Sequence, residues 1–353
     1  KGETDGFDLY KAQFKGNYVE EMRNPDMYNR IGYDSIDKAA SLYRKNQWIL
    51  LANENQFDVF NAIFSSKRKI NSVFDSVFQG IATSDDKLFV LERNEAGSFT
   101  LPKTGATYQL EPDFFKPMLK GEDVHKWSEL RTNRYVFFPY KKPNYEPVSL
   151  DELERNYPLT YKYVMENEKL FKSRESGKAG KMPIWYAYIY PKNKDKFEQI
   201  KLCSMEICSN HPNVTLNSGA TFLYHNTKVY SWVKKEDVVE SYKFLMAILN
   251  SNLIWWFLKQ TGDTLSSDSI TFKTEYLNPF PMPLTPDEPV RAKVETLVES
   301  IMQDTAEGRN TAQKEMKLNA MVYKLYGLTY NQVLSIDTTM SMFTDSEYNN
   351  VLE

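Results

Sequence analysis

Two short segments of this chain contain part of the residue set with which DNA amino-methyltransferases hold a base. They read Asn24-Pro25-Asp26-Met27 and Asn278-Pro279-Phe280. In those enzymes an Asn, Asp or Ser and a proline-stiffened carbonyl accept the hydrogens of the base's amino group. A second proline follows, and an aromatic ring stacks on the base. Neither segment has the second proline, and the chain has no glycine-rich turn that would seat S-adenosylmethionine. The sequence therefore predicts no methyltransferase site in these residues.

A nuclease site of the Asp…Glu-x-Lys type is the second candidate chemistry. It needs two carboxylates to hold Mg²⁺ and a lysine to activate water, and Asp304 with Glu315-Met316-Lys317 supplies these residue types. The segment has the pattern of an amphipathic helix, on which Glu and Lys are ordinary surface residues. The chain also lacks a Gly-x-Ser-x-Gly turn, and its three histidines have no recognisable partner spacing. We therefore expect no catalytic residue and no bound cofactor in this chain.

A third group, made of Cys203, Cys208, His211 and His225, has the composition of a two-Cys, two-His zinc site. The two cysteines fall in an apolar run typical of a strand, where positions five apart point to opposite faces and lie about 16 Å apart. That separation excludes a disulfide and joint ligation. A turn after Ser209 would bring the four together, so a zinc site stays open as the weaker alternative. We expect buried strand cysteines and no metal.

A concentration of positive charge lies between residues 169 and 201. This segment has nine cations against three acids, a net charge of +6, within a chain whose net charge is −3. Lysines grouped in this way neutralise DNA phosphates, and Arg174, in a stretch rich in Gly and Lys, has the donors to bind guanine O6 and N7. The aromatic run 185–190 is suited to pack this loop or to touch sugar and base. The alternative is that the lysines are merely solvated and that the aromatic residues form a strand core.

The elements that would position these residues follow from the apolar pattern. At 353 residues, with 41% hydrophobic and 14% aromatic residues, the chain is long enough for about two domains with their own cores. The pattern predicts strands at 48–51, 88–91, 134–140, 203–209 and 220–225. It predicts helices at 57–64, 151–172, 244–258 (interrupted at 250–252), 294–302 and 311–325, the last ending at Gly327. The central half is thus predicted to be α/β and the C-terminal region helical.

The chain has no segment typical of a membrane protein. A membrane span needs about 18 consecutive apolar residues, and the longest candidate, 244–258, is interrupted by Asn250-Ser251-Asn252. The N-terminus lacks the cationic start and apolar core of a signal peptide. Two cysteines in the whole chain suit a reducing compartment. We therefore expect a cytoplasmic protein with no membrane partner.

Five segments, in the same order, resemble the TaqI-like C-terminal specificity domain of restriction–modification enzymes. They are residues 80–90 (GIATSDDKLFV), 119–127 (LKGEDVHKW), 244–252 (FLMAILNSN), 280–283 (FPMP) and 321–329 (MVYKLYGLT). The first segment departs from the family pattern at Ser84, which stands in place of a glycine, so we expect that turn to differ. The last segment is similar to one common in type IIG enzymes. The resemblance covers roughly residues 45–335.

The resemblance implies a mixed α/β (α+β) target recognition domain followed by a helical C-terminal region. We expect a junction segment at residues 1–44, the recognition domain at 45–285 and the helical region at 286–353. The implied function is sequence-specific binding of double-stranded DNA, as part of a type IIG or related restriction–modification enzyme. Its methyltransferase domain or subunit, absent from this chain, would use S-adenosylmethionine to methylate adenine. A nuclease part would use Mg²⁺.

The residues expected to contact DNA are cations of the basic segment, one aromatic residue, and one lysine from segment 119–127. They are Lys126, Lys172, Arg174, Lys178, Lys181, Tyr186, Lys192 and Lys194. Two other functions stay open. One is a stand-alone specificity subunit that docks separate catalytic chains through the helices of residues 294–325. The other is a protein-interaction domain that binds no DNA, which the net negative charge favours slightly.

Overall fold

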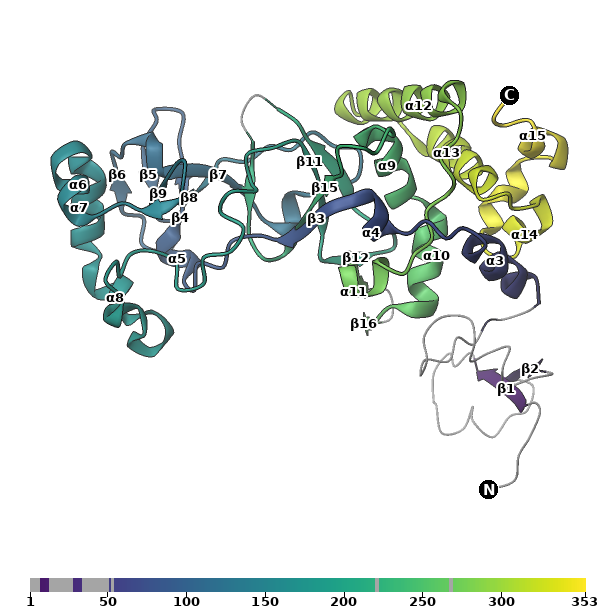
Figure 1. The fold of residues 1–353 in the computed structure, drawn as a ribbon, viewed down its shortest axis with the longest axis horizontal. Coiled ribbons are helices and arrows are strands. Elements are labelled where there is room, and N and C mark those ends of the chain that lie inside the picture. Colours follow the sequence, from purple (N-terminus) through teal and green to yellow (C-terminus); the bar gives the residue numbers. More distant parts are fainter. Residues whose placement is uncertain (1–6, 13–27, 34–50, 52–53, 220–221, 267–268) are drawn as a thin grey trace.

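The computed structural model describes residues 7–12, 28–33, 51, 54–219, 222–266 and 269–353. The fold is mixed α/β and elongated, with sheets and short helices at one end and a helical region at the other (Figure 1). This arrangement confirms the predicted fold class. Among the described residues, none of the helices combines the length and apolar character needed to cross a membrane.

A four-stranded antiparallel sheet forms the middle of the molecule, in the order β13-β11-β15-β3. Leu202 of β11 and Trp232 of β15 pair directly and are fully buried. The Trp232 indole N–H donates to Ser204 Oγ at 2.8 Å, so the polar atom of this large side chain is satisfied inside the core. The strands are β3 (Phe74–Gln79), β11 (Lys201–Met205), β13 (Val214–Asn217) and β15 (Val229–Lys234).

The chain leaves this sheet after β3 and returns to it at β11. The residues between them, 80–200, together with β14, form a second unit that we call the distal lobe. Its sheet has the order β14-β7-β8-β4-β5-β6, and helices α6 to α8 lie at the far end of the molecule (Figure 1). Its elements are α5 (Asp86–Phe89), β4 (Val90–Arg93), β5 (Phe99–Thr100), β6 (Thr107–Tyr108), η2 (Pro112–Phe114), β7 (Phe115–Leu119), η3 (Gly121–Asp123), β8 (Arg134–Phe137), β9 (Tyr140–Lys141), β10 (Glu146–Pro147), α6 (Leu150–Asn156), α7 (Pro158–Glu166), α8 (Glu168–Gly177), η4 (Ala179–Lys181) and β14 (Tyr224–His225).

The remaining described chain from residue 51 on, including the central sheet, is called the proximal unit. One core joins β11, the helix α9 and the helix α12, and therefore continues across residue 285; the domain boundary there stays a prediction. Asn250 interrupts the helical pattern as expected, because its side-chain amide bonds to both backbone groups of Val214 at 2.9 and 2.8 Å. The elements are α3 (Glu54–Phe64), α4 (Ile70–Val73), β12 (Ile207–Ser209), α9 (Tyr242–Leu249), α10 (Asn252–Thr261), β16 (Thr264–Ser266), β17 (Ser269–Thr271), α11 (Thr274–Leu277), α12 (Glu288–Ala306), α13 (Ala312–Leu325), α14 (Tyr330–Leu334), η5 (Thr338–Met342) and α15 (Asp345–Asn349).

The FPMP segment works as a strap that ties the loop after α3 to α13. The Met282 N–H donates to Arg68 O at 2.8 Å, and the Ser66 hydroxyl donates to Met282 O at 2.6 Å. From the other side, the Tyr326 hydroxyl donates to Pro281 O at 2.9 Å. Proline has no N–H and suits an extended segment. This family-like motif therefore has a structural role in the fold.

Five predictions of regular structure are wrong in detail. The strand predicted at 134–140 ends at Phe137, and Tyr140 belongs to β9 in another sheet. Of the strand predicted at 220–225, the described residues are strand only at Tyr224–His225. The run 203–209 is not one strand, because the chain bends at Glu206 and continues as β12 in a different sheet. The first residues of the strand predicted at 88–91 belong to α5, a helical turn before β4. The helix predicted over 151–172 is three helices, with breaks at Tyr157 and Asn167.

Other predictions at the N-terminal side fall partly outside the described residues. This applies to Asn24-Pro25-Asp26-Met27 and to 48–50 of the predicted strand 48–51. Within the expected junction segment, β1 (Phe7–Ala12) and β2 (Tyr28–Tyr33) pair in antiparallel fashion. Ser84 has a φ of 63°, the left-handed conformation that favours glycine. The serine thus occupies a backbone position typical of the glycine that it replaces.

Candidate nucleic-acid interface

The basic segment starts inside α8, which stops being helical at Arg174. Arg174 has an extended backbone (φ −57°, ψ 145°), and Glu175 and Ser176 then have positive φ angles of 48° and 53°. Positive φ is unfavourable for residues that carry a Cβ atom. After this turn, η4 folds back beside α8. We call residues 175–181 the basic tip; it follows α8, which lies at the lower edge of the distal lobe in Figure 1.

Three of the predicted DNA-contacting lysines, Lys178, Lys181 and Lys192, are exposed. Lys178 Nζ lies 3.2 Å from the hydroxyl of Tyr190 and 4.6 Å from the centre of its ring. That ring is 44% exposed, so it supports the ammonium group without removing it from water. Within the described part of the chain, the side chains of Lys181 and Lys192 have no hydrogen bond or ion pair. All three are positioned so that a phosphate can approach them.

Arg174, expected to reach a guanine from a flexible loop, lies inside the protein instead. It is 4% exposed, and its charged group lies 4.7 Å from the centre of the Phe89 ring. The guanidinium donates to the backbone carbonyls of Phe171 (3.0 Å), Thr83 (3.2 Å), Trp185 (2.7 Å) and Ala187 (2.8 Å). Burial lowers its pKa to about 10, so the group is still charged at neutral pH. In this position Arg174 holds protein segments together and cannot read a base.

Tyr186, the aromatic residue expected to contact DNA, is also buried. Its hydroxyl donates to Val148 O, and burial raises its pKa. Tyr188, fully enclosed as well, donates to Phe137 O at 2.6 Å. The run 185–190 contains no strand, yet its side chains form core. The packing alternative is therefore the correct interpretation for Tyr186, and only Tyr190 of this run is exposed.

The remaining predicted lysines are half-buried and have partners within the protein. Lys172 pairs with Glu168 and lies 5.0 Å from the Trp185 ring centre. Lys194 donates to Tyr145 O and lies 4.5 Å from the centre of the Tyr140 ring. Lys126 pairs with Glu315 of α13. The structure therefore brings Lys178, Lys181 and Lys192 to the surface of the distal lobe, and places Lys126 at a contact with the proximal unit.

A groove of about 260 Å³ beside Lys194 adds lysines that the sequence reading missed. Lys116, Lys141 and Lys142 line it together with Tyr145 and Glu198. These lysines come from β7 and from β9 with its following turn, and they become neighbours only when the sheet forms. Because the grouping is not local in sequence, charge counting along the chain could not find it. The groove is a second group of lysines in the distal lobe, separate in sequence from the basic tip.

Glu198 is the acidic counterpart inside this groove. It forms an ion pair with Lys142, and it accepts a hydrogen bond from the Tyr224 hydroxyl at 2.7 Å. Partial burial opposes ionisation, but the hydrogen bonds from Lys142 and Tyr224 hold the pKa of Glu198 below its usual value. With Asp113, which also lines the groove, Glu198 offers acceptors beside the lysine donors. Such an arrangement suits contact with both the phosphates and the amino groups of DNA.

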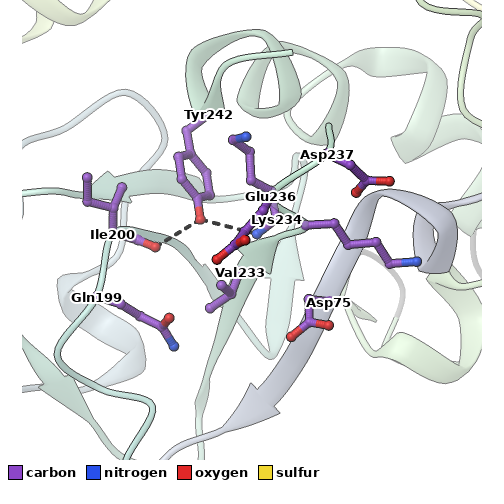
Figure 2. Close-up of a pocket in the computed structure, with 9 residues that line it drawn as sticks. Asp75, Gln199, Ile200, Val233, Lys234, Glu236, Asp237 and Tyr242 are labelled. Carbon is purple, nitrogen blue, oxygen red and sulfur yellow. Dashed lines mark hydrogen bonds between the residues drawn. The ribbon is translucent and has the colours of Figure 1, made fainter. Parts of the chain in front are cut away.

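A larger groove, of about 910 Å³, lies where the distal lobe joins the central sheet (Figure 2). Its polar lining mixes three carboxylates, Asp75, Glu236 and Asp237, with Lys234 and Lys235. Tyr242 closes one side, donating to Ile200 O at 2.9 Å and accepting from Lys234 N at 3.1 Å. Acids outnumber lysines here, so this groove does not suit a phosphate backbone.

The candidate catalytic and metal groups are occupied by structural contacts. Cys203 and Cys208 are free thiols, buried as expected. Within the described residues, no group of three or more His, Cys, Asp or Glu side chains could hold a metal ion. Asp304 accepts hydrogen bonds from Arg309 and Lys314, and Glu315 pairs with Lys126. The carboxylates of the nuclease-like pattern thus stabilise the helices that carry them.

Comparison with known proteins supports the family resemblance over the middle of the chain. Residues 116–282 match the family model of the TaqI-like C-terminal specificity domain. The fold is similar to that of a solved structure of the Type IIL restriction–modification enzyme MmeI in complex with DNA, with 14% sequence identity and a TM-score of 0.56. The similarity covers 99% of this chain and 42% of that chain. No curated protein matches.

Proposed function

We propose that this chain binds double-stranded DNA and selects the target sequence as the specificity part of a restriction–modification enzyme. The observation that carries the proposal is the match of residues 116–282 to the TaqI-like C-terminal specificity domain. The matched residues include the basic tip and the lysine groove beside Lys194. A fold alone does not define an activity. Here a specificity-domain match and an exposed group of lysines agree.

The exposed lysines define the part of the surface that we assign to the phosphate backbone. Lys178, Lys181 and Lys192 carry charges that face solvent, and each phosphate that they neutralise releases counterions. The groove with Lys116, Lys141 and Lys142 is the second contact region. A chain with a net charge of −3 can bind DNA when its cations are concentrated in part of its surface.

We further propose that the chemistry is carried out by a methyltransferase domain or subunit that lies outside this chain. That part would use S-adenosylmethionine to methylate adenine, and an associated nuclease would use Mg²⁺. Support comes from the coverage: this chain corresponds to 42% of the MmeI chain. A fused arrangement and the cytoplasm are the proposed setting. Reading the frame upstream of Lys1 distinguishes a fused enzyme from a separate specificity subunit.

The test of DNA binding is fluorescence anisotropy on duplex DNA across a salt series. Lys178→Ala combined with Lys181→Ala should weaken binding to all sequences and lower the slope of log affinity against log salt by about two units. The matched control is Lys293→Ala with Lys317→Ala, two exposed lysines on α12 and α13 at the other end of the molecule. No salt-dependent binding by the unmodified protein would refute the proposed function.

A further inference from the structure

The basic tip has a backbone that its own sequence does not favour. Glu175 and Ser176, both with side chains, have positive φ angles in succession, and Gly177 follows with a φ of 85°. Residues with a Cβ atom keep such conformations only when the surroundings hold them. Three left-handed residues in a row reverse the chain, so that η4 returns toward α8. Contacts beneath the tip must therefore fix this turn.

Arg174 supplies contacts at the base of the turn. Its guanidinium joins α8, through Phe171 O, to the turn before α5, through Thr83 O. Two further N–H groups donate to the carbonyls of Trp185 and Ala187, which follow the tip in sequence. One side chain thus connects the chain that enters the tip with the chain that leaves it. A planar guanidinium with five donors bonds here to four carbonyls of three segments, one more than the three donors of a lysine could serve.

The tip is also pressed against the helix from which it emerges. Ala179 is fully buried. A Cβ atom on Gly180 would lie 3.1 Å from Lys172 O and 3.3 Å from Lys172 Cβ, so a larger residue in η4 would require a shift of a few tenths of an ångström against α8. The neighbouring side chains, Lys178 and Lys181, remain exposed. Within residues 178–181 only Ala179 is buried, and it anchors the turn while the two lysines face solvent.

We propose that Arg174 is the positioning residue of the DNA interface: it fixes the basic tip from inside the lobe so that Lys178 and Lys181 reach adjacent phosphates. The inference rests on the proposed function and deepens it. Arg174 does not touch DNA. Its effect on binding passes through the two lysines, because without the guanidinium the entering and leaving segments separate and the left-handed turn relaxes. A tip without fixed geometry loses the phosphate contacts while keeping its charges.

A double-mutant cycle tests the positioning role of Arg174. The affinity of the 353-residue chain for duplex DNA is measured by fluorescence anisotropy across a salt series. Arg174→Met should lower the salt slope by about as much as the Lys178→Ala/Lys181→Ala pair, about two units. When Arg174→Met is added to that pair, no further loss of slope or affinity is expected. Additive losses in the triple variant would overturn the proposal, because Arg174 would then act independently of the lysines.

Two further variants separate positioning from general stability. Arg68→Met removes an arginine of the proximal unit that binds Glu240 at 2.5 Å and Pro283 O at 3.3 Å; it should lower the melting temperature and leave the salt slope unchanged. Gly180→Ala places a Cβ atom against Lys172 without removing any Arg174 contact, and it should flatten the slope where it shifts the tip. A Gly180→Ala variant with a lowered melting temperature and an unchanged slope would show that the geometry of the tip does not govern the phosphate contacts, which would refute the positioning role.

The two proposals fail in different ways. If the unmodified protein shows no salt-dependent binding to duplex DNA, the proposed function itself fails. If it binds DNA and the lysine pair flattens the slope, while folded Arg174→Met leaves the slope unchanged, only the positioning role fails. Far-ultraviolet circular dichroism at the assay temperature establishes which variants are folded.

Discussion

The buried core of the distal lobe is mostly aromatic, whereas that of the proximal unit is mostly aliphatic. In the distal lobe the rings also carry hydrogen-bonding groups: the hydroxyls of Tyr163, Tyr186 and Tyr188 donate to backbone carbonyls. Residues 182–200 contain no helix or strand, so their backbone cannot satisfy itself through regular pairing. The helices of the proximal unit do so internally. Irregular chain near the candidate interface is thus stabilised by side chains instead of by secondary structure.

The largest expected loss of stability comes from replacing one large buried side chain by alanine in each of the two cores. Phe137, packed on Phe89, Phe115 and Phe171, is fully buried in the distal lobe, as is Ile301 in the proximal unit. Phe137→Ala should lower the free energy of unfolding by about 3–5 kcal/mol and Ile301→Ala by about 2–5 kcal/mol. Urea unfolding measures both costs. DNA affinity, measured where both variants are folded, should fall only for Phe137→Ala; equal losses would show that the two regions are not separable.

Acid should weaken the contact between the two regions. His225 of β14 is buried with Nε2 2.5 Å from Ser231 Oγ on β15, and burial lowers its pKa to about 3. In the unfolded chain this histidine has a pKa near 6.5. Between about pH 6.5 and pH 3 the unfolded chain therefore binds a proton at His225 that the folded chain does not bind. The stability contributed by neutral His225 is therefore complete above about pH 6.5 and is lost as the pH falls toward 3, by at most about 1.4 kcal/mol per pH unit.

His225→Gln isolates this contribution from other acid-sensitive groups. The variant should be less stable than the unmodified protein at pH 7, and the difference should shrink by about 2–3 kcal/mol at pH 4.5, since glutamine does not titrate. Urea unfolding at the two pH values gives the comparison. His211→Gln, on the loop before β13, is the matched control. A difference between variant and parent that is the same at both pH values would contradict the prediction.

A smaller effect is expected from single hydroxyl groups. Tyr186→Phe leaves Val148 O unsatisfied in the distal lobe, and Tyr326→Phe leaves Pro281 O unsatisfied in the proximal unit. Each should lower the free energy of unfolding by about 1–3 kcal/mol. Only Tyr186→Phe should speed amide hydrogen exchange across residues 182–200, because that segment depends on side-chain donors. Unchanged exchange in that segment would mean that its order has another source.

The smallest expected effect concerns the one acid on the basic tip. Glu175 is exposed beside Lys178, and its charge offsets part of the attraction to phosphates. Glu175→Gln should strengthen DNA binding by about 0.2–1 kcal/mol without changing the salt slope, since no lysine–phosphate contact is added. Anisotropy titrations measure both quantities, with Glu288→Gln at the start of α12 as control. A weaker affinity would indicate that Glu175 contacts DNA as an acceptor.

The same contrast explains which features could be predicted from the sequence. In the proximal unit the spacing of Phe57, Phe60 and Ile63 predicted α3, and Gly327, with a φ of 69°, follows α13 as expected. These signals are local, because a helix repeats every 3.6 residues and ends at characteristic residues. In the distal lobe the partners of Tyr186 and Tyr188 lie 38 and 51 residues away in sequence. No local period encodes such contacts.

The candidate site shows the same limit. The local excess of lysine in the sequence was enough to predict that Lys178, Lys181 and Lys192 are exposed, because lysine side chains are usually at the surface whatever the tertiary structure. It could not distinguish Arg174, whose carbonyl partners are set by tertiary packing. Nor could it find the groove lysines, which gather only through the pairing of strands. Composition therefore predicts the location of the charged surface, while the geometry within it depends on the fold.

The strap has a consequence for the protein as it is being made. Met282 of the strap bonds to Ser66, which lies 216 residues earlier in the chain. At about 5–20 residues per second, a ribosome needs roughly 10–45 s to cover that distance. During most of this time Phe60 of α3 has been synthesised, but Trp256 and Phe257, the rings against which it packs in the folded protein, have not. The speed of translation through the residues between α3 and α10 therefore sets how long this early helix exposes its apolar face to other nascent chains.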